Sequence, residues 1–237
     1  MEPEYLFKIG KPLYKNELKT ENDLKDFVSE GTVIASIKND ELLLEHEQKP
    51  DDAHFVYWNK NQFSDNIVIE WNFRPLAEPG LCMLFFAASG KGQKDLFDAS
   101  LPVRTGEYPE YHSGEINALH LSYFRRKWSE ERRFHTCNLR KSAGFHLVAQ
   151  GADPIPSVAD VNQNYQMKLI YFKGIAQFSI NDLVVLEWKD TDSSMGPVLQ
   201  EGKIGFRQMA PMKAAYSQLI ISEAHLIHKK NRGEQNE

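Results

Sequence analysis

The chain has 237 residues, 41% of them hydrophobic and 26% charged, and its formal net charge is -5 at pH 7. This length is enough for a domain with a large buried core. The mildly acidic balance argues against general binding of nucleic acid or of anionic membranes. The first residues, MEPEYLFKIGK, lack the apolar segment of a signal peptide, and no apolar run approaches the roughly 18 residues of a membrane span. We therefore expect a cytoplasmic protein.

Short strand-like runs separated by turn signals follow one another along the chain. Residues 66–74, NIVIEWNFR, alternate strictly between two faces, and residues 81–88 are apolar on both faces, as in a covered central strand. Residues 89–111 form a loop that is long enough to bind a ligand. Further strands are expected at 32–37, 41–45, 53–58, 115–126, 144–150, 165–172, 175–180, 183–188, 202–209 and 216–221, with a helical turn at 21–28.

This succession of short strands, with almost no helix, predicts an all-β fold. We expect a two-sheet antiparallel jelly-roll sandwich that spans residues 1–237 as a single domain. The chain becomes strongly charged near its end, so we expect a flexible tail from about residue 226.

The cysteines and acidic residues do not form a recognisable metal motif. Cys82 and Cys137 lie far apart in hydrophobic surroundings and are expected to be buried thiols, since neither a disulfide nor a zinc spacing is present. Asp95, Asp98 and Glu107 could hold calcium, but the pattern favours a solvated acidic loop. We therefore expect no metal and no cofactor.

The stretch from residue 104 to residue 151 carries more polar and aromatic side chains than a core requires. In its first strand candidate, His120, Ser122 and Arg126 share one face, opposite a row of leucines. A two-residue period directs one row into a core and the other onto the surface of a sheet. Histidine, arginine and serine on such a surface are typical of a face that binds a polar ligand. A solvated face of a plain antiparallel sheet would show the same alternation.

A basic cluster lies within this stretch, although the chain as a whole is acidic. Seven lysine and arginine residues fall between positions 125 and 141. Such a cluster indicates a local anionic ligand, but Glu130 and Glu131 could neutralise part of it in ordinary ion pairs.

Four segments of the chain carry a family resemblance. They read GLCMLFFAASGKG, DLFDASLPVRTGEYPEYHSGEINALHLSYFRRK, RRFHTCNLRKSAGFHLVAQGADPIP and GKIGFRQMAPMKAAYSQLIIS, and the match extends from about residue 53 to residue 224. In order and spacing they resemble the bacterial YesU-type proteins, a family of uncharacterised function. The resemblance implies a galectin-like, concanavalin A-like jelly roll of the lectin/glucanase type. It also implies a pectin-degradation context with rhamnogalacturonan, and it brings no established catalytic residue.

An extended oligosaccharide is expected in the concave face of such a jelly roll. Arginine offers a planar fork that suits the carboxylate of a uronate, and Trp58, Tyr111, Phe124 and Trp128 are the aromatic rings that could stack on a sugar. The expected substrate-binding residues are Glu70, Arg74, His112, Glu115, Asn117, Ser122, Asn138, His146, Gln150 and Arg207. Taken singly, each of them also fits a solvated strand position.

A uronate lyase is the first of three functions that this set of residues could serve. β-Elimination needs a cation that neutralises the carboxylate, a base for the C5 proton and an acid for the leaving oxygen. We assign the two proton transfers to His120 and Tyr111, and the carboxylate clamp to Arg126 and Arg140.

Two alternatives remain open. A lectin-like protein would bind the same oligosaccharide without turnover, and a jelly roll by itself does not distinguish binding from catalysis. A glycoside hydrolase needs two carboxylates about 5–9.5 Å apart, and the ExDxxE string of sandwich glycosidases is missing, since Asn72 and Arg74 follow Glu70. The expected partner is an acidic plant-derived oligosaccharide, with no nucleic acid and no membrane, and a homo-oligomer is left open.

Overall fold

The computed structural model describes residues 2–46 and 54–229. Its strands are β1 (Tyr5–Asn16), β2 (Phe27–Gly31), β3 (Ile34–Lys38), β4 (Glu41–Glu45), β5 (His54–Asn59), β6 (Asn66–Ala77), β7 (Leu81–Gly90), β8 (Ile116–Tyr123), β9 (Thr136–Ser142), β10 (His146–Ala152), β11 (Tyr165–Phe172), β12 (Ile175–Ile180), β13 (Leu183–Lys189), β14 (Lys203–Met209) and β15 (Lys213–Lys229). The helices are two short α-helices, α1 (Tyr108–His112) and α2 (Ser129–Arg133), and the 3₁₀ turns η1 (Asp23–Asp26), η2 (Lys91–Gln93), η3 (Val158–Asp160) and η4 (Ser193–Met195).

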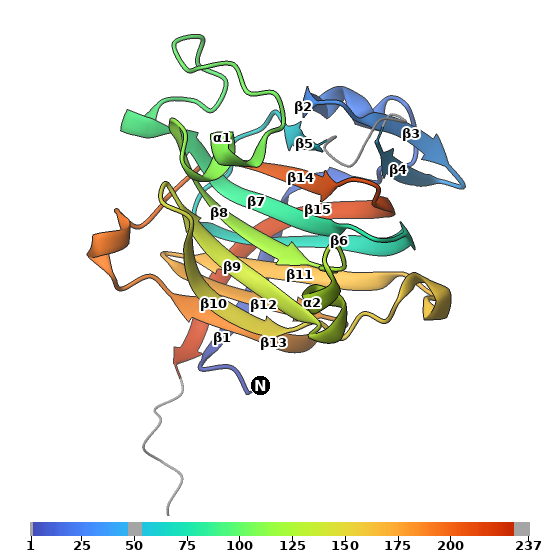
Figure 1. Cartoon of the computed structure of the whole chain (residues 1–237). Helices are drawn as coiled ribbons and strands as arrows, with labels where there is room; N and C mark the ends of the chain where they lie inside the picture. The colour runs from blue at the N-terminus through green and yellow to red at the C-terminus, as the bar shows by residue number, and fades with distance from the viewer. Residues whose placement is uncertain (1, 47–53, 230–237) are drawn as a thin grey trace, which may run out of the picture.

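The strands form two antiparallel sheets that pack face to face (Figure 1). The eight-stranded sheet has the order β13-β12-β11-β6-β15-β4-β3, and β1 pairs with β15 beside this path. The seven-stranded sheet has the order β10-β9-β8-β7-β14-β5-β2. Figure 1 shows α1 near the start of β8 and α2 beyond its end, so the two short helices flank the outer face of the seven-stranded sheet.

The main core lies between the sheets and is built by the alternating strands. The apolar row of β6 faces inward, and Trp71 at its centre is 1% exposed. The ring of Trp71 lies 5.9 Å from that of Tyr123 on β8, 6.3 Å from Phe178 on β12 and 6.1 Å from Phe206 on β14. The strict alternation of residues 66–74 thus produces the predicted half-buried strand.

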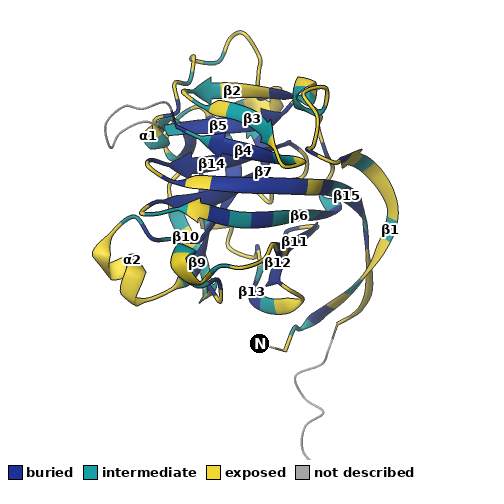
Figure 2. Ribbon diagram, turned by 90° about the vertical axis from the view of Figure 1, so that its right-hand side faces the viewer, coloured by how far each residue is buried: buried dark blue, intermediate teal, exposed yellow. Residues whose placement is uncertain are grey.

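Strand β7 is buried on both faces, as its sequence predicts. Leu84 and Phe86 point into the main core, whereas Met83 and Phe85 belong to a second apolar cluster on the outer side of the sheet. The segment between β7 and β8, which includes α1, covers that outer side. Figure 2 shows β7 and β14 buried in the interior of the sandwich, with β1 exposed at its edge.

Some predicted elements differ from the structure, and three strands were not predicted. The expected helical turn at 21–28 is only the turn η1, and the strands β1 and β2, which the pattern does not predict, flank it. The pattern also misses β9. The chain does not become a free tail at residue 226, because β15 pairs with β1 as far as Lys229; the rest of the expected tail lies outside the described residues. In the described part of the chain, no helix is long and apolar enough to cross a membrane.

Candidate functional site

Two rows of side chains cross the outer face of the seven-stranded sheet, because residues paired across antiparallel strands point to the same side. The first row consists of Phe85 on β7, His120 on β8 and Arg140 on β9. The second row consists of Arg207 on β14, Met83 on β7, Ser122 on β8, Asn138 on β9 and Gln150 on β10. Six of the expected site residues therefore lie on one face.

Helix α1 is held onto one end of this face by Tyr111. The Tyr111 side chain is fully buried, and its ring lies 6.3 Å from Trp58 and 5.6 Å from Phe85. Its hydroxyl donates to the Glu30 carboxylate at 2.9 Å, which also accepts from the Trp58 indole at 2.9 Å and from Arg104 at 3.0 and 2.6 Å. Tyr111 therefore anchors α1. Its hydroxyl is bonded to Glu30 and is not free for the proton transfer that we assigned to it from the sequence.

The imidazole of His120 is buried and bonded on both sides. It is 1% exposed and stacks on Phe85 with a centroid distance of 5.2 Å. Nδ1 lies 2.9 Å from the hydroxyl of Tyr108, and Nε2 lies 2.9 Å from the hydroxyl of Ser142. The residue that reaches His120 from α1 is thus Tyr108, not Tyr111.

Burial, together with the charges of Arg140, His112 and Arg207, lowers the pKa of His120 to about 3. The unfolded chain takes up a proton near pH 6.5, whereas the folded chain does not, so stability falls as the pH falls below 6.5. Between pH 7 and pH 5, we expect His120 to account for a loss of about 2 kcal/mol in the free energy of unfolding. Urea denaturation at both pH values measures it.

The variant His120→Gln is the control for this prediction, because an amide can keep two hydrogen bonds without titrating in this range. Its loss of stability between pH 7 and pH 5 should be smaller than that of the wild type by about 2 kcal/mol. Parallel losses in the two proteins would contradict a neutral, buried His120.

An exposed aromatic edge borders the face next to His120. Phe145, which follows β9, is 38% exposed, and the guanidinium of Arg140 lies 3.9 Å above its ring. The ring of His112 lies 4.4 Å from Phe145, and Leu147 on β10 is 49% exposed. A flat apolar ring beside a half-buried cation is an arrangement on which a sugar ring can stack.

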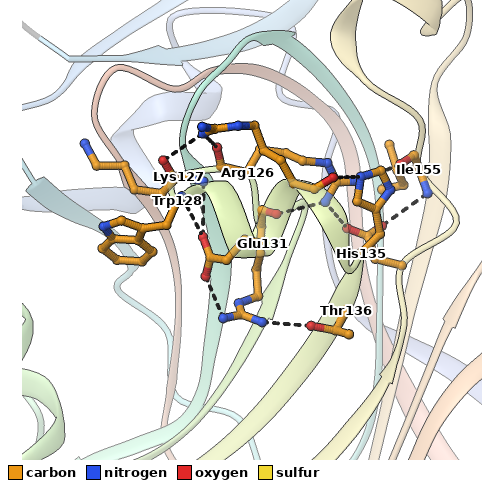
Figure 3. Close-up of polar contacts among 10 residues, drawn as sticks. Arg126, Lys127, Trp128, Glu131, His135, Thr136 and Ile155 are labelled. Carbon is orange, nitrogen blue, oxygen red and sulfur yellow. Dashed lines mark hydrogen bonds and ion pairs between the residues drawn. The ribbon is translucent and has the colours of Figure 1, made fainter.

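Arg125 borders the opposite end of the face, where α2 fixes it. Its guanidinium contacts the buried carboxylate of Glu131 at 2.5 Å and the hydroxyl of Thr136 at 2.8 Å (Figure 3). The same carboxylate accepts from the backbone N–H groups of Lys127 and Trp128 and so caps α2. The Trp128 side chain is 50% exposed at this end.

Arg126 does not form the expected clamp with Arg140. Its side chain is 1% exposed and pairs with the Asp153 carboxylate at 3.1 Å, and it also donates to the carbonyl oxygen of Ile155 at 2.8 Å (Figure 3). Strand β8 ends at Tyr123, and the chain then turns, so the alternation that relates Arg126 to His120 does not continue. Arg126 therefore fastens the segment after β10 to the sandwich.

Glu70 and Arg74 lie on β6 in the eight-stranded sheet, away from the other expected residues. Glu70 is 3.9 Å from the Lys168 ammonium group, and Arg74 pairs with Glu41. These two residues cannot share a ligand with His120, because the whole sandwich separates the outer faces of the two sheets.

Three further expected residues lie at the margins of the seven-stranded sheet. Glu115 is exposed and pairs with Lys91 at 3.3 Å. Asn117 precedes His120 by three positions, so the strand period directs it to the other side of β8. His146 pairs in register with Lys141 and not with Arg140. The side chain of Lys141 reaches Asp190 between the sheets.

The structure thus gathers a set of residues that we call the basic face. Sequence analysis missed three of its members, Tyr108, Arg125 and Phe145. The spacing of Tyr108 and Tyr111 on either side of Pro109 could have indicated a helical turn that directs both rings toward the sheet. The basic face consists of Tyr108, His112, His120, Ser122, Arg125, Asn138, Arg140, Phe145, Gln150 and Arg207.

Two of the acidic residues considered for calcium are engaged in other contacts. Asp95 pairs with Lys203 at 2.9 Å, and Asp98 accepts from the backbone and hydroxyl of Ser100. Within residues 2–46 and 54–229, no group of three or more His, Cys, Asp or Glu side chains is arranged to hold a metal ion.

The sequence and the fold have close relatives in Bacillus subtilis. A family model described as a domain of unknown function (DUF1961) matches residues 11–221. The chain is 58% identical to the Uncharacterized protein YesU of Bacillus subtilis (strain 168) over 219 residues, which cover 92% of this chain and 99% of the relative. The resemblance to YesU-type proteins is thereby confirmed.

A crystal structure of a Bacillus subtilis protein of unknown function with a galectin-like fold superposes with a TM-score of 0.90 at 57% identity, over 92% of this chain and 99% of that one. Carbohydrate-binding module CBM66 from Bacillus subtilis has a TM-score of 0.52 at 15% identity, over 84% and 96% of the two chains. A Bauhinia forficata lectin in complex with GalNAc has a TM-score of 0.56 at 12% identity, over 91% of this chain and 99% of that one. The predicted jelly-roll sandwich is confirmed.

Proposed function

The chain belongs to the DUF1961 family, and we propose that it binds an acidic oligosaccharide on the basic face. The observation that carries this proposal is the gathering of three arginines from separate parts of the chain on this one face. The Arg207 guanidinium lies 5.0 Å from the ring centre of Tyr108, the Arg140 guanidinium lies 3.9 Å from that of Phe145, and Arg125 borders the opposite end next to Thr136. Three cations on one face favour an anionic ligand.

Two of these arginines have their charge available for a ligand. Among the described residues, no carboxylate forms an ion pair with Arg140 or Arg207, whereas Arg125 is paired with Glu131. A uronate carboxylate fits the planar fork of a guanidinium, and the exposed ring of Phe145 beside Arg140 offers a stacking surface. The hydrogen-bonded amides of Asn138 and Gln150, 2.8 Å apart, add polar groups for sugar hydroxyls.

The fold supports the same class of ligand. A carbohydrate-binding module and a lectin share it with this chain at low identity. The resemblance to YesU-type proteins makes rhamnogalacturonan fragments of pectin the first ligands to test, since their backbone carries a uronate.

Isothermal titration of the whole protein with rhamnogalacturonan oligosaccharides tests the proposal. A neutral oligosaccharide of matched length, without carboxylates, is the control. One or two charge-assisted contacts should make the acidic ligand bind at least about tenfold more tightly, and this advantage should shrink as the salt concentration rises. Equal affinity for both ligands, or no binding of either, would refute the proposal.

A uronate lyase on the same face is the second candidate, and the Tyr108–His120 contact favours it. Arginine near a carboxylate acidifies the C5 proton, and a tyrosine–histidine pair could move protons. Burial, however, raises the pKa of Tyr108 to about 12 and lowers that of His120 to about 3, so neither is a good base near neutral pH. The ultraviolet absorbance of an unsaturated uronate during the same incubation measures turnover, and Tyr108→Phe is the control.

A glycoside hydrolase is the least supported of the three functions. Two carboxylates at the ends of the basic face, Glu30 and Glu131, are already bound. Glu30 accepts from two side chains besides Arg104, and Glu131 accepts from Arg125 and from two backbone N–H groups. These two carboxylates therefore do not form the free acid–base pair that this chemistry requires.

A further inference from the structure

Arg207 is a fully buried cation whose hydrogen-bonding capacity is largely unused. Its side chain is 0% exposed, and Nη1 donates to the carbonyl oxygen of Gly106 at 2.7 Å. Nε and Nη2 are buried and have no hydrogen-bond partner among the residues that the structure describes. Two nitrogen atoms of a desolvated guanidinium are therefore left open, which is rare in folded proteins.

Other buried cations of this protein are neutralised. Arg126 pairs with Asp153 at 3.1 Å, and Lys141 pairs with Asp190 at 2.7 Å, in each case with both side chains almost fully buried. Burying an uncompensated charge costs several kcal/mol, and burial accordingly lowers the pKa of Arg207. In the described residues no carboxylate lies within ion-pair distance of Arg207.

Two tyrosine rings compensate the charge only in part. The Arg207 guanidinium lies 5.0 Å from the ring centre of Tyr108 and 5.4 Å from that of Tyr111. A desolvated cation–π contact stabilises the guanidinium, but a ring face does not replace the acceptor that each N–H group lacks. The N–H groups of Nε and Nη2 therefore still require a pair of acceptor oxygen atoms.

The unused atoms have the geometry that a carboxylate needs. Nε and Nη2 lie on the same edge of a guanidinium, so their N–H groups form a fork for two oxygens. Arg104 of this protein uses the same edge on Glu30, with Nε at 3.0 Å and Nη2 at 2.6 Å from the carboxylate oxygens. In Arg207, the equivalent edge makes no hydrogen bond within the described residues.

We propose that Arg207 is the carboxylate-binding subsite of the basic face and takes one uronate group side-on through Nε and Nη2. This inference rests on the proposed function, and it names the chemical group that the site selects. Tyr108 is the cover of the subsite, because its ring contacts Arg207 on one side and His120, at 5.7 Å, on the other. Because Arg207 is 0% exposed, this proposal requires that the half-buried Tyr108 side chain turn aside when the ligand enters.

The test compares sodium galacturonate with galactose, at matched ionic strength, by thermal denaturation of the whole protein. Galacturonate should raise the melting temperature of the wild type, and galactose should not. Arg207→Met should lose the shift, with an affinity at least about tenfold weaker. Its own melting temperature should stay close to that of the wild type, because removing a buried charge that has no ion-pair partner offsets the loss of the Gly106 hydrogen bond and of the tyrosine contacts.

Arg207→Lys is the second variant, and it keeps the charge without the fork. It should lose most of the shift, since an ammonium group cannot bind a carboxylate side-on in two parallel bonds. Arg104→Met, which removes an arginine already paired with Glu30, is the matched control and should keep the shift. An equal shift in the wild type and both Arg207 variants overturns the inference, as does the absence of any galacturonate shift in the wild type.

The outcomes separate this inference from the proposed function. If acidic oligosaccharides bind equally to the wild type and to Arg207→Met, the basic face binds its ligand without Arg207, and the inference fails alone. If galacturonate binds through Arg207 but oligosaccharides do not bind, the subsite stands and the proposed function fails. A strongly destabilised Arg207→Met with an unchanged galacturonate shift assigns Arg207 to the packing of the tyrosines and overturns the inference.

Discussion

Replacing Asp153 with alanine should lower the free energy of unfolding by about 3–5 kcal/mol, because it leaves the buried charge of Arg126 without its partner. The two side chains are 0% and 1% exposed, and their atoms Oδ2 and Nη1 are 3.1 Å apart. Oδ1 of Asp153 also accepts from the backbone N–H of Ile155 at 3.1 Å, so a loop contact is lost as well. Urea denaturation at neutral pH measures the change.

The control for this prediction removes both charges together. In Arg126→Met/Asp153→Leu, no unpaired ion remains, and apolar side chains of similar size fill the space. Most of the stability should therefore return. A loss below about 1 kcal/mol in the single variant would contradict the assignment of Arg126 to folding, because surface ion pairs have effects of that size.

The strand pattern predicts those elements whose two faces meet different environments. Residues 66–74 alternate because one side of β6 meets the core, and residues 81–88 are apolar throughout because α1 covers the outer side of β7. The turn Asn181–Asp182 between β12 and β13 has a similar local cause: both residues have positive φ angles, of 48° and 63°, which Asn and Asp tolerate.

Strand β1 was missed because little in its sequence reflects its position. Most of its twelve residues are exposed or half-buried, and it is held by backbone pairing with β15 over residues 219–229. A strand whose partner supplies hydrogen bonds rather than a core has no strong apolar period to detect. Its place in the sheet depends on contacts with residues more than 200 positions away.

Only part of the candidate site was predicted, because its assembly, like the place of β1, depends on contacts between distant parts of the chain. Alternation correctly directs His120, Asn138 and Arg140 outward, but it does not identify the sheet to which a strand belongs. Arg74 alternates in the same way and lies on the other side of the sandwich. Tyr108 begins α1, in a segment that the sequence predicts as a loop, and strand periodicity says nothing about direction there.

Arg140→Ala should weaken binding of an acidic oligosaccharide by about 30-fold or more, which corresponds to about 2 kcal/mol. The Arg140 guanidinium is half-buried, pairs with no carboxylate in the described residues and lies directly on the exposed Phe145 ring. Its removal takes away both a fork for a uronate and part of the stacking edge. Isothermal titration measures the affinity.

Arg74→Ala is the matched control, because it removes the same side chain from the outer face of the opposite sheet. Arg74 is engaged by Glu41 and by Asn164 at 3.0 Å, so its loss should leave the affinity within about twofold of the wild type. The variant Arg140→Lys, which keeps the charge but not the fork, should fall between wild type and Arg140→Ala. If Arg74→Ala weakened binding and Arg140→Ala did not, the ligand would lie on the eight-stranded sheet, and the basic face would have a different role.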